Sequence, residues 1–133
     1  MQYLSIKKEE WDKAIEQLLL SYTIFAAVDN EFGIDYEIVS PENISRISYN
    51  KAKPATSLKT FFLPVKENVT SGASLKKQRV IIGAPNCDIQ GLKLLDEIYL
   101  DKDFYDIFYQ ERRENTIIIS IDCFDKQEHC HCS

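Results

Sequence analysis

The chain has 133 residues, of which 44% are hydrophobic and 28% charged, and its formal net charge is −5. This composition suits one globular domain with its own core, and the acidic balance argues against nucleic-acid binding. The sequence contains no apolar run of about 18 residues that could cross a membrane. It also lacks an apolar leader after Met1, so we expect no membrane insertion and a cytoplasmic location, where structural disulfides are rare.

The N-terminal part of the chain predicts a helix followed by a hairpin. After Ser5, apolar residues recur at intervals of three and four over residues 11–19, which is typical of an amphipathic helix. Residues 21–28 are rich in strand formers, and residues 34–39 alternate between apolar and polar side chains. The turn-forming residues 29–33 lie between these two runs, so we expect a β-hairpin.

The C-terminal part predicts two parallel strands joined by two helices. Residues 79–83 and 116–121 are continuous apolar runs, as expected of buried parallel strands. Between them, residues 89–100 place apolar side chains on one helical face, and residues 104–112 predict a second helix. Such a crossover makes the two strands parallel and neighbouring. We therefore predict an α/β (or α+β) fold, a mixed sheet with this C-terminal strand–helix–helix–strand unit and an N-terminal helix plus hairpin.

The soft metal ligands are concentrated at the end of the chain. The last eleven residues hold three of the four cysteines and both histidines. The complete set is Cys87, Cys123, His129, Cys130, His131 and Cys132. Thiolate and imidazole groups hold zinc or iron–sulfur clusters in proteins. The spacing Cys-x6-Cys-x-Cys matches neither a standard zinc finger nor a ferredoxin motif, so the sequence does not decide between a zinc site and an iron–sulfur cluster. A metal-free interpretation, with buried inert thiols and solvent-exposed histidines, also remains.

The predicted sheet brings two of these thiols together. Cys87 follows the strand at 79–83, and Cys123 follows the strand at 116–121. The carboxyl ends of parallel strands lie at one sheet edge, where sites form in open α/β sheets. We therefore expect Cys87 and Cys123 to lie near each other, and the tail to bring Cys130 and Cys132 into the same space.

Three sequence blocks carry a resemblance to a known family. Residues 80–100 contain Cys87-Asp88 followed by a Leu-Leu-Asp element, residues 112–116 read Arg-Arg-Glu-Asn-Thr, and residues 123–133 end in the cysteine tail. These blocks resemble the beta subunits of cytoplasmic sulfhydrogenases and the related electron-transfer subunits of anaerobic sulfite reductases. The family segment has Phe between its last two cysteines, where this chain has His131.

The resemblance implies a function in electron transfer. Residues 1–133 would form a single iron–sulfur-binding domain, the N-terminal part of a longer protein with a ferredoxin-like domain downstream. One 4Fe-4S cluster would be held by Cys87, Cys123, Cys130 and Cys132, with no catalytic residue in the chain. The domain would pass electrons to flavin- or sirohaem-bearing and hydrogenase-type redox subunits, as a non-catalytic part of an anaerobic oxidoreductase. The alternative is a structural or partner-binding domain that holds zinc, with His129 and His131 as further ligands, or no metal.

Charged residues at the predicted helix ends suggest smaller roles. Asp88 is a candidate N-cap for the helix at 89–100, and Asp103 or Asp106 for the next helix. Arg112 and Arg113 suit a helix C-terminus, where cations complement the dipole. A sharper hypothesis places these two arginines beside an anionic thiolate cluster, where they would raise its reduction potential.

Overall fold

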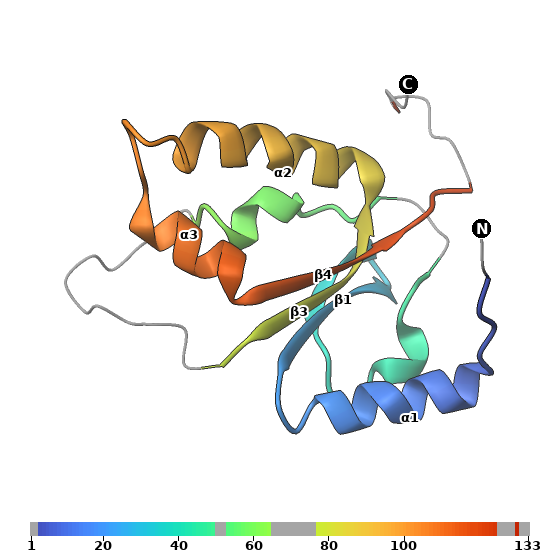
Figure 1. Cartoon of the computed structure of the whole chain (residues 1–133). Coiled ribbons are helices and arrows are strands. Elements are labelled where there is room, and N and C mark those ends of the chain that lie inside the picture. The colour runs from blue at the N-terminus through green and yellow to red at the C-terminus, as the bar shows by residue number, and fades with distance from the viewer. Residues whose placement is uncertain (1–2, 50–52, 65–76, 125–129, 131–133) are drawn as a thin grey trace.

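The fold is a mixed four-stranded sheet with helices on both faces, seen in a computed structural model that describes residues 3–49, 53–64, 77–124 and 130 (Figure 1). The strand order is β2-β1-β3-β4. Within the described residues the elements in chain order are α1 (Lys8–Leu18), β1 (Thr23–Asn30), β2 (Gly33–Ile38), the 3₁₀ helices η1 (Ile44–Arg46) and η2 (Leu58–Phe61), β3 (Arg79–Pro85), α2 (Asn86–Tyr99), α3 (Ile107–Glu114) and β4 (Thr116–Ile121). The predicted α/β-type fold, with its N-terminal helix and hairpin, is confirmed.

The two halves of the sheet pair as the sequence patterns predict. Strands β1 and β2 form an antiparallel hairpin, and β3 pairs in parallel with both β1 and β4. In the β3–β4 ladder Val80 lies opposite Ile117, and Ile81 lies opposite Ile118. The predicted crossover is therefore confirmed: β3, α2, α3 and β4 follow one another in the chain, and the two strands are neighbours.

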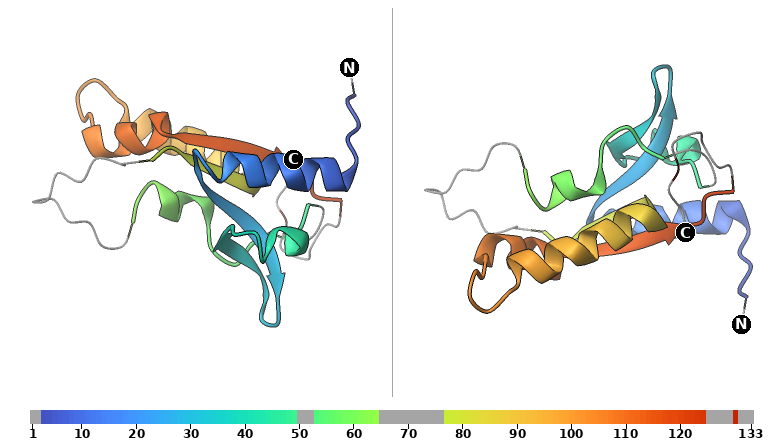
Figure 2. Two further views of the ribbon diagram at one scale, coloured as in Figure 1. Left: turned by 90° about the horizontal axis from the view of Figure 1, so that it is seen from below. Right: turned by 90° about the horizontal axis from the view of Figure 1, so that it is seen from above.

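Helices cover the two faces of the sheet from opposite sides. Helix α1 lies against one face, whereas α2 and α3 lie against the other, as the two views of Figure 2 show. The side chains of β3 alternate between the two resulting cores: Val80 and Ile82 face the α1 cluster, and Ile81 and Ala84 face the α2–α3 cluster. Burial on both faces explains why β3 is an unbroken apolar run. The longest described helix, α2, has 14 residues, and no helix among the described residues combines the length and hydropathy of a membrane span.

Gly83 lets β3 reach the point where the chain turns into α2. Its φ is +96°, a conformation that side-chain-bearing residues rarely adopt, and the β3–β4 register shifts between Ile82 and Ala84. A Cβ atom at this position would lie 3.0 Å from the Cβ of Ala27 on the neighbouring strand. The glycine therefore serves both the bulge and the close approach of β1 and β3.

The second core contains a polar network that ties α3 to α2. Asp106 is the N-cap of α3 and accepts hydrogen bonds from the backbone N–H groups of Phe108 and Tyr109. Of the two predicted caps, Asp103 and Asp106, the structure therefore confirms Asp106. The buried Tyr109 hydroxyl donates to Asp96 Oδ1 at 2.7 Å. Arg113 completes the network with two hydrogen bonds of 2.8 Å to the Asp96 carboxylate.

Candidate metal centre

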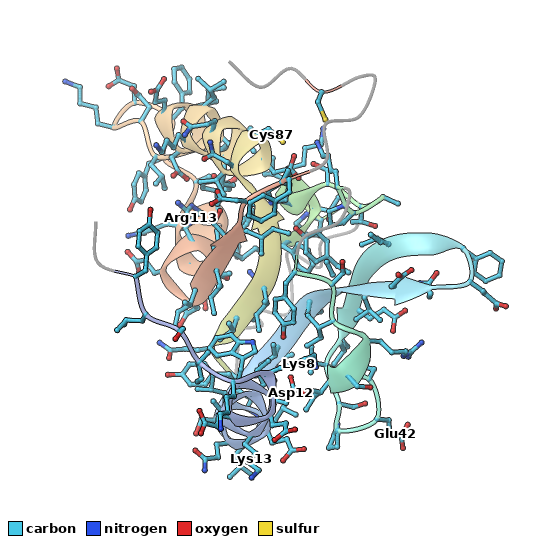
Figure 3. The ribbon with its side chains drawn as sticks, turned by 90° about the vertical axis from the view of Figure 1, so that its right-hand side faces the viewer. Lys8, Asp12, Lys13, Glu42, Cys87 and Arg113 are labelled. Atoms are coloured by element: carbon cyan, nitrogen blue, oxygen red, sulfur yellow. The ribbon has the colours of Figure 1, made fainter. Side chains whose placement is uncertain are left out.

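Cys87 lies at the junction between β3 and α2. The strand ends at Pro85 and the helix begins at Asn86, so Cys87 occupies the first turn of α2 with its side chain exposed. Figure 3 shows the Cys87 sulfur at this end of the helix. The thiol is therefore accessible from solvent at the point where the strand passes into the helix.

Cys123 reaches the same edge of the sheet from the neighbouring strand. The last pair of the parallel β3–β4 ladder joins Pro85 to Ile121, and Cys123 follows Ile121 by two residues. Cys87 and Cys123 line one hollow of about 350 Å³, together with Asn86, Asp122 and Phe124. The expectation that these two thiols emerge at one sheet edge is confirmed. Both are exposed, and no disulfide joins Cys87, Cys123 and Cys130 to one another.

Lys53 lies at this corner, paired with Asp88. The pKa of the Lys53 ammonium is raised, first by its hydrogen bond to Asp88 and further by the charges of Asp88, Cys87 and Cys130. Cys130, the third cysteine that the structure describes, is also exposed. Across the described ranges, no three Cys, His, Asp or Glu side chains are grouped closely enough to hold a metal ion.

The remaining predicted ligands fall where the structure gives no description. These residues are His129, His131 and Cys132, which lie outside the described residues. The structure therefore brings Cys87 and Cys123 together at one hollow. Convergence of all four sulfurs stays a prediction.

Asp88 is not the N-cap of α2; its carboxylate instead joins the segment of Lys53 and Leu58 to the start of this helix. The helix begins at Asn86, earlier than predicted, so Asp88 sits inside the first turn, and Pro85 occupies the cap position without a side-chain hydrogen bond. Asp88 Oδ2 accepts from the backbone N–H of Leu58 at 3.2 Å, and Oδ1 pairs with Lys53 Nζ at 2.6 Å. Sequence reasoning missed Lys53, because no local pattern connects it to a carboxylate so much later in the chain.

Arg112 and Arg113 do not lie beside the thiols. Both occupy the last turn of α3, which leads into the start of β4, whereas Cys123 follows the end of β4. The six residues of β4 span five steps of ~3.3 Å, so the two ends of this strand lie about 17 Å apart. Arg112 Nη1 donates to the Phe62 carbonyl at 3.1 Å, and Arg113 binds Asp96. The hypothesis that these arginines tune a cluster is wrong, and their place in the last turn of α3 fits the dipole interpretation.

The Tyr36 hydroxyl is a further buried polar group of the α2–α3 core. Its oxygen is buried and has no hydrogen-bond partner among the described residues. Burial raises the pKa of Tyr36, and the charges of Asp88, Asp35 and Cys87 raise it further. The ring packs edge-on against Phe61, with centroids 5.3 Å apart. Tyr36 is therefore a neutral hydroxyl in the α2–α3 core, without a hydrogen-bond partner among the described residues.

Comparison with known proteins finds one distant relative along almost the whole chain. The chain is distantly homologous to sulfhydrogenase 2 subunit beta. That protein, from Pyrococcus furiosus, is 25% identical over 139 residues, an alignment that covers 99% of this chain and 40% of the relative. The chain thus spans about two fifths of the relative's length. No protein-family model matches the chain, and no solved structure matches it. The resemblance inferred from the cysteine blocks is confirmed as distant homology.

Proposed function

We propose that this chain is an electron-transfer domain that binds one 4Fe-4S cluster within an anaerobic redox complex of the hydrogenase or sulfite-reductase type. The proposed ligands are Cys87, Cys123, Cys130 and Cys132. One observation carries the proposal: Cys87 and Cys123, delivered by two adjacent parallel strands, are both exposed and line the same hollow. The distant homology to a sulfhydrogenase beta subunit gives independent support for a place in a redox complex.

The chemistry of the donor set fits such a cluster. Four thiolates are the usual ligands of a 4Fe-4S cluster, which supplies one-electron transfer when it is bound. Cys87 offers its thiol from the exposed first turn of α2. The Tyr36 hydroxyl is buried without a hydrogen-bond partner among the described residues, and a donor that reaches a sulfur ligand tunes a redox centre.

The exposed position of the thiols suits exchange of electrons with another protein. A cluster at an open sheet edge lies at the molecular surface, where a partner can approach it closely. We therefore propose flavin- or sirohaem-bearing and hydrogenase-type subunits as partners, and assign no catalytic residue to this chain. We also propose that residues 1–133 form one domain and that a ferredoxin-like domain follows in the full protein, in keeping with the greater length of the relative. The cytoplasmic location stays a prediction.

Metal analysis of anaerobically grown and purified protein tests the proposal. We expect stoichiometric iron and inorganic sulfide, with a broad visible absorption that bleaches on reduction. Cys87→Ser and Cys123→Ser are each expected to lose the iron and the absorption. The matched control is Ser120→Ala, an exposed position near the end of β4, which should retain both.

Zinc is the outcome that would replace this proposal. Stoichiometric zinc without iron in the anaerobic preparation would exclude the cluster and favour a structural site. In that case His129 and His131 become the first residues to substitute, because imidazole is a common zinc ligand. Loss of zinc in His129→Ala or His131→Ala would then identify the histidine that binds.

A further inference from the structure

A charge pair lies directly beside the Cys87 thiol. Lys53 Nζ is 2.6 Å from Asp88 Oδ1, and the Cys87 thiol donates a weak hydrogen bond to the same oxygen, with Sγ 4.0 Å away. The Lys53 ammonium therefore cannot lie farther from the sulfur than these two distances combined. The two partners differ in exposure, because the Asp88 side chain is 7% exposed and that of Lys53 is 48% exposed.

The carboxylate of this pair is fixed in place by the fold. Asp88 Oδ2 accepts the backbone N–H of Leu58, whose own side chain is buried in the α2–α3 core. This hydrogen bond joins η2 to the first turn of α2. Asp88 therefore cannot swing away from Cys87 without releasing the Leu58 segment, and its negative charge stays next to the thiol.

A fixed carboxylate is unfavourable beside a thiolate, because like charges at this separation repel. The repulsion grows when several thiolates gather at one site. A cation that neutralises the carboxylate removes this cost without disturbing the hydrogen bond to Leu58. Lys53 lies in the position that this compensation requires, and its flexible side chain reaches Asp88 from the solvent side.

We propose that Lys53 is a positioning residue of the thiolate site: held by Asp88, its ammonium offsets the carboxylate beside Cys87 and so lowers the cost of gathering anionic sulfurs at this sheet edge. Its role toward a cluster rests on the proposed function. The charge compensation itself does not, because it acts on the Cys87 sulfur whether or not a metal is bound.

The local potential at Cys87 can be measured in the reduced, metal-free full chain. Iodoacetate is anionic and iodoacetamide is neutral, and both alkylate the same thiolate. We take the alkylation rate with iodoacetate divided by the rate with iodoacetamide, each followed by mass spectrometry of the Cys87 peptide. Because the fraction of thiolate cancels in this ratio, the ratio reports the local potential at Cys87. We expect Lys53→Gln to lower this ratio about threefold, the effect of one unit charge at roughly 7 Å in water.

Companion variants separate charge from structure. Lys53→Arg keeps the cation and should keep the ratio. Lys53→Gln combined with Asp88→Asn removes both charges, so its ratio should return toward that of the unmodified chain. Lys13→Gln removes a lysine of α1 on the opposite face of the sheet, far from Cys87 in Figure 3, and should change nothing. Salt at about 1 M should erase the effect of Lys53→Gln, because the screening length falls to about 3 Å.

Two results would overturn the proposal. An unchanged ratio in Lys53→Gln would show that the ammonium does not act on Cys87. A double variant as low as the single variant would show that Lys53 acts through structure and not through charge. Iron uptake is scored separately: a chain whose alkylation ratio responds as expected but which binds no iron supports the charge pair and refutes the proposed cluster.

Discussion

Replacing Tyr109 by Phe tests the polar network that ties α3 to α2. Tyr109 is completely buried, and its hydroxyl donates to Asp96 at 2.7 Å. The substitution removes that hydroxyl alone, since a Phe ring can keep the stacking on Tyr99 and the tilted contact with Phe62. The measured loss can then be assigned to one hydrogen bond.

The magnitude follows from the charge and surroundings of the acceptor. A hydrogen bond to an ionised group contributes about 1.5–3 kcal/mol. Asp96 is one-quarter exposed and keeps both hydrogen bonds from Arg113 in the variant. We therefore expect a decrease of about 1.5 kcal/mol in the free energy of unfolding, at the lower end of that range.

Urea unfolding at neutral pH, followed by circular dichroism, is the appropriate assay. Tyr105→Phe is the matched control, because Tyr105 is about half exposed and its substitution should change stability by less than ~0.5 kcal/mol. The Tyr109→Phe loss should also shrink when Asp96 is already Asn. Equal stability of the two tyrosine variants, or the same loss in both Asp96 backgrounds, would refute the network as described.

Three further predictions concern the backbone and the charged groups. Gly83→Ala should lower the free energy of unfolding by about 1–3 kcal/mol, because Gly83 has φ +96° and an added Cβ would press on Ala27. Gly91→Ala is the control: this glycine of α2 faces open space, so the substitution should raise the free energy of unfolding by up to about 1 kcal/mol. Thermal and urea unfolding compare the two variants, and equal effects would contradict the role of the bulge. Asp106→Ala should cost about 1 kcal/mol in urea unfolding by removing the cap of α3, and Asp106→Asn should recover most of it; no loss in the alanine variant would argue against the cap. Arg113 lowers the pKa of Asp96, first through its hydrogen bonds, so the ionised Asp96 stabilises the folded state fully above the usual carboxyl pKa. This contribution to the free energy of unfolding is lost as the pH falls through the lowered pKa. Asp96→Asn should therefore lose less stability on acidification than the unmodified chain, and an identical dependence of unfolding on pH would exclude the linkage.

The sheet and the two cysteines of its edge were predictable because their signals are local. The apolar runs of β3 and β4 and the helical pattern between them define a crossover, and the crossover places Cys87 and Cys123 at one edge. The start of α2 was misjudged because Asp88 has the chemistry of an N-cap, whereas in the fold its carboxylate serves Leu58 and Lys53.

Contacts between segments that lie far apart in the chain could not be predicted from the sequence pattern. Lys53 lies in an irregular stretch, and only the folded chain brings it to Asp88. The sequence around Arg113 suits a cluster as well as a helix end, and only the structure shows this side chain bound to Asp96. Short-range periodicity predicts elements and their order, but the choice of partner for a charged side chain depends on packing that such patterns do not encode.

The parallel pairing of β3 with β4 has a consequence for metal affinity. A ligand set drawn from distant parts of an unfolded chain must first close a long loop, and that closure costs conformational entropy. Here folding of the sheet has already met this cost for Cys87 and Cys123, so a metal that used both sulfurs would bind a pair that the fold has already brought to one hollow. By thermodynamic linkage, a metal that used both sulfurs would stabilise the β3–β4 ladder, and a substitution would weaken the apparent metal affinity to the extent that it lets the ladder open.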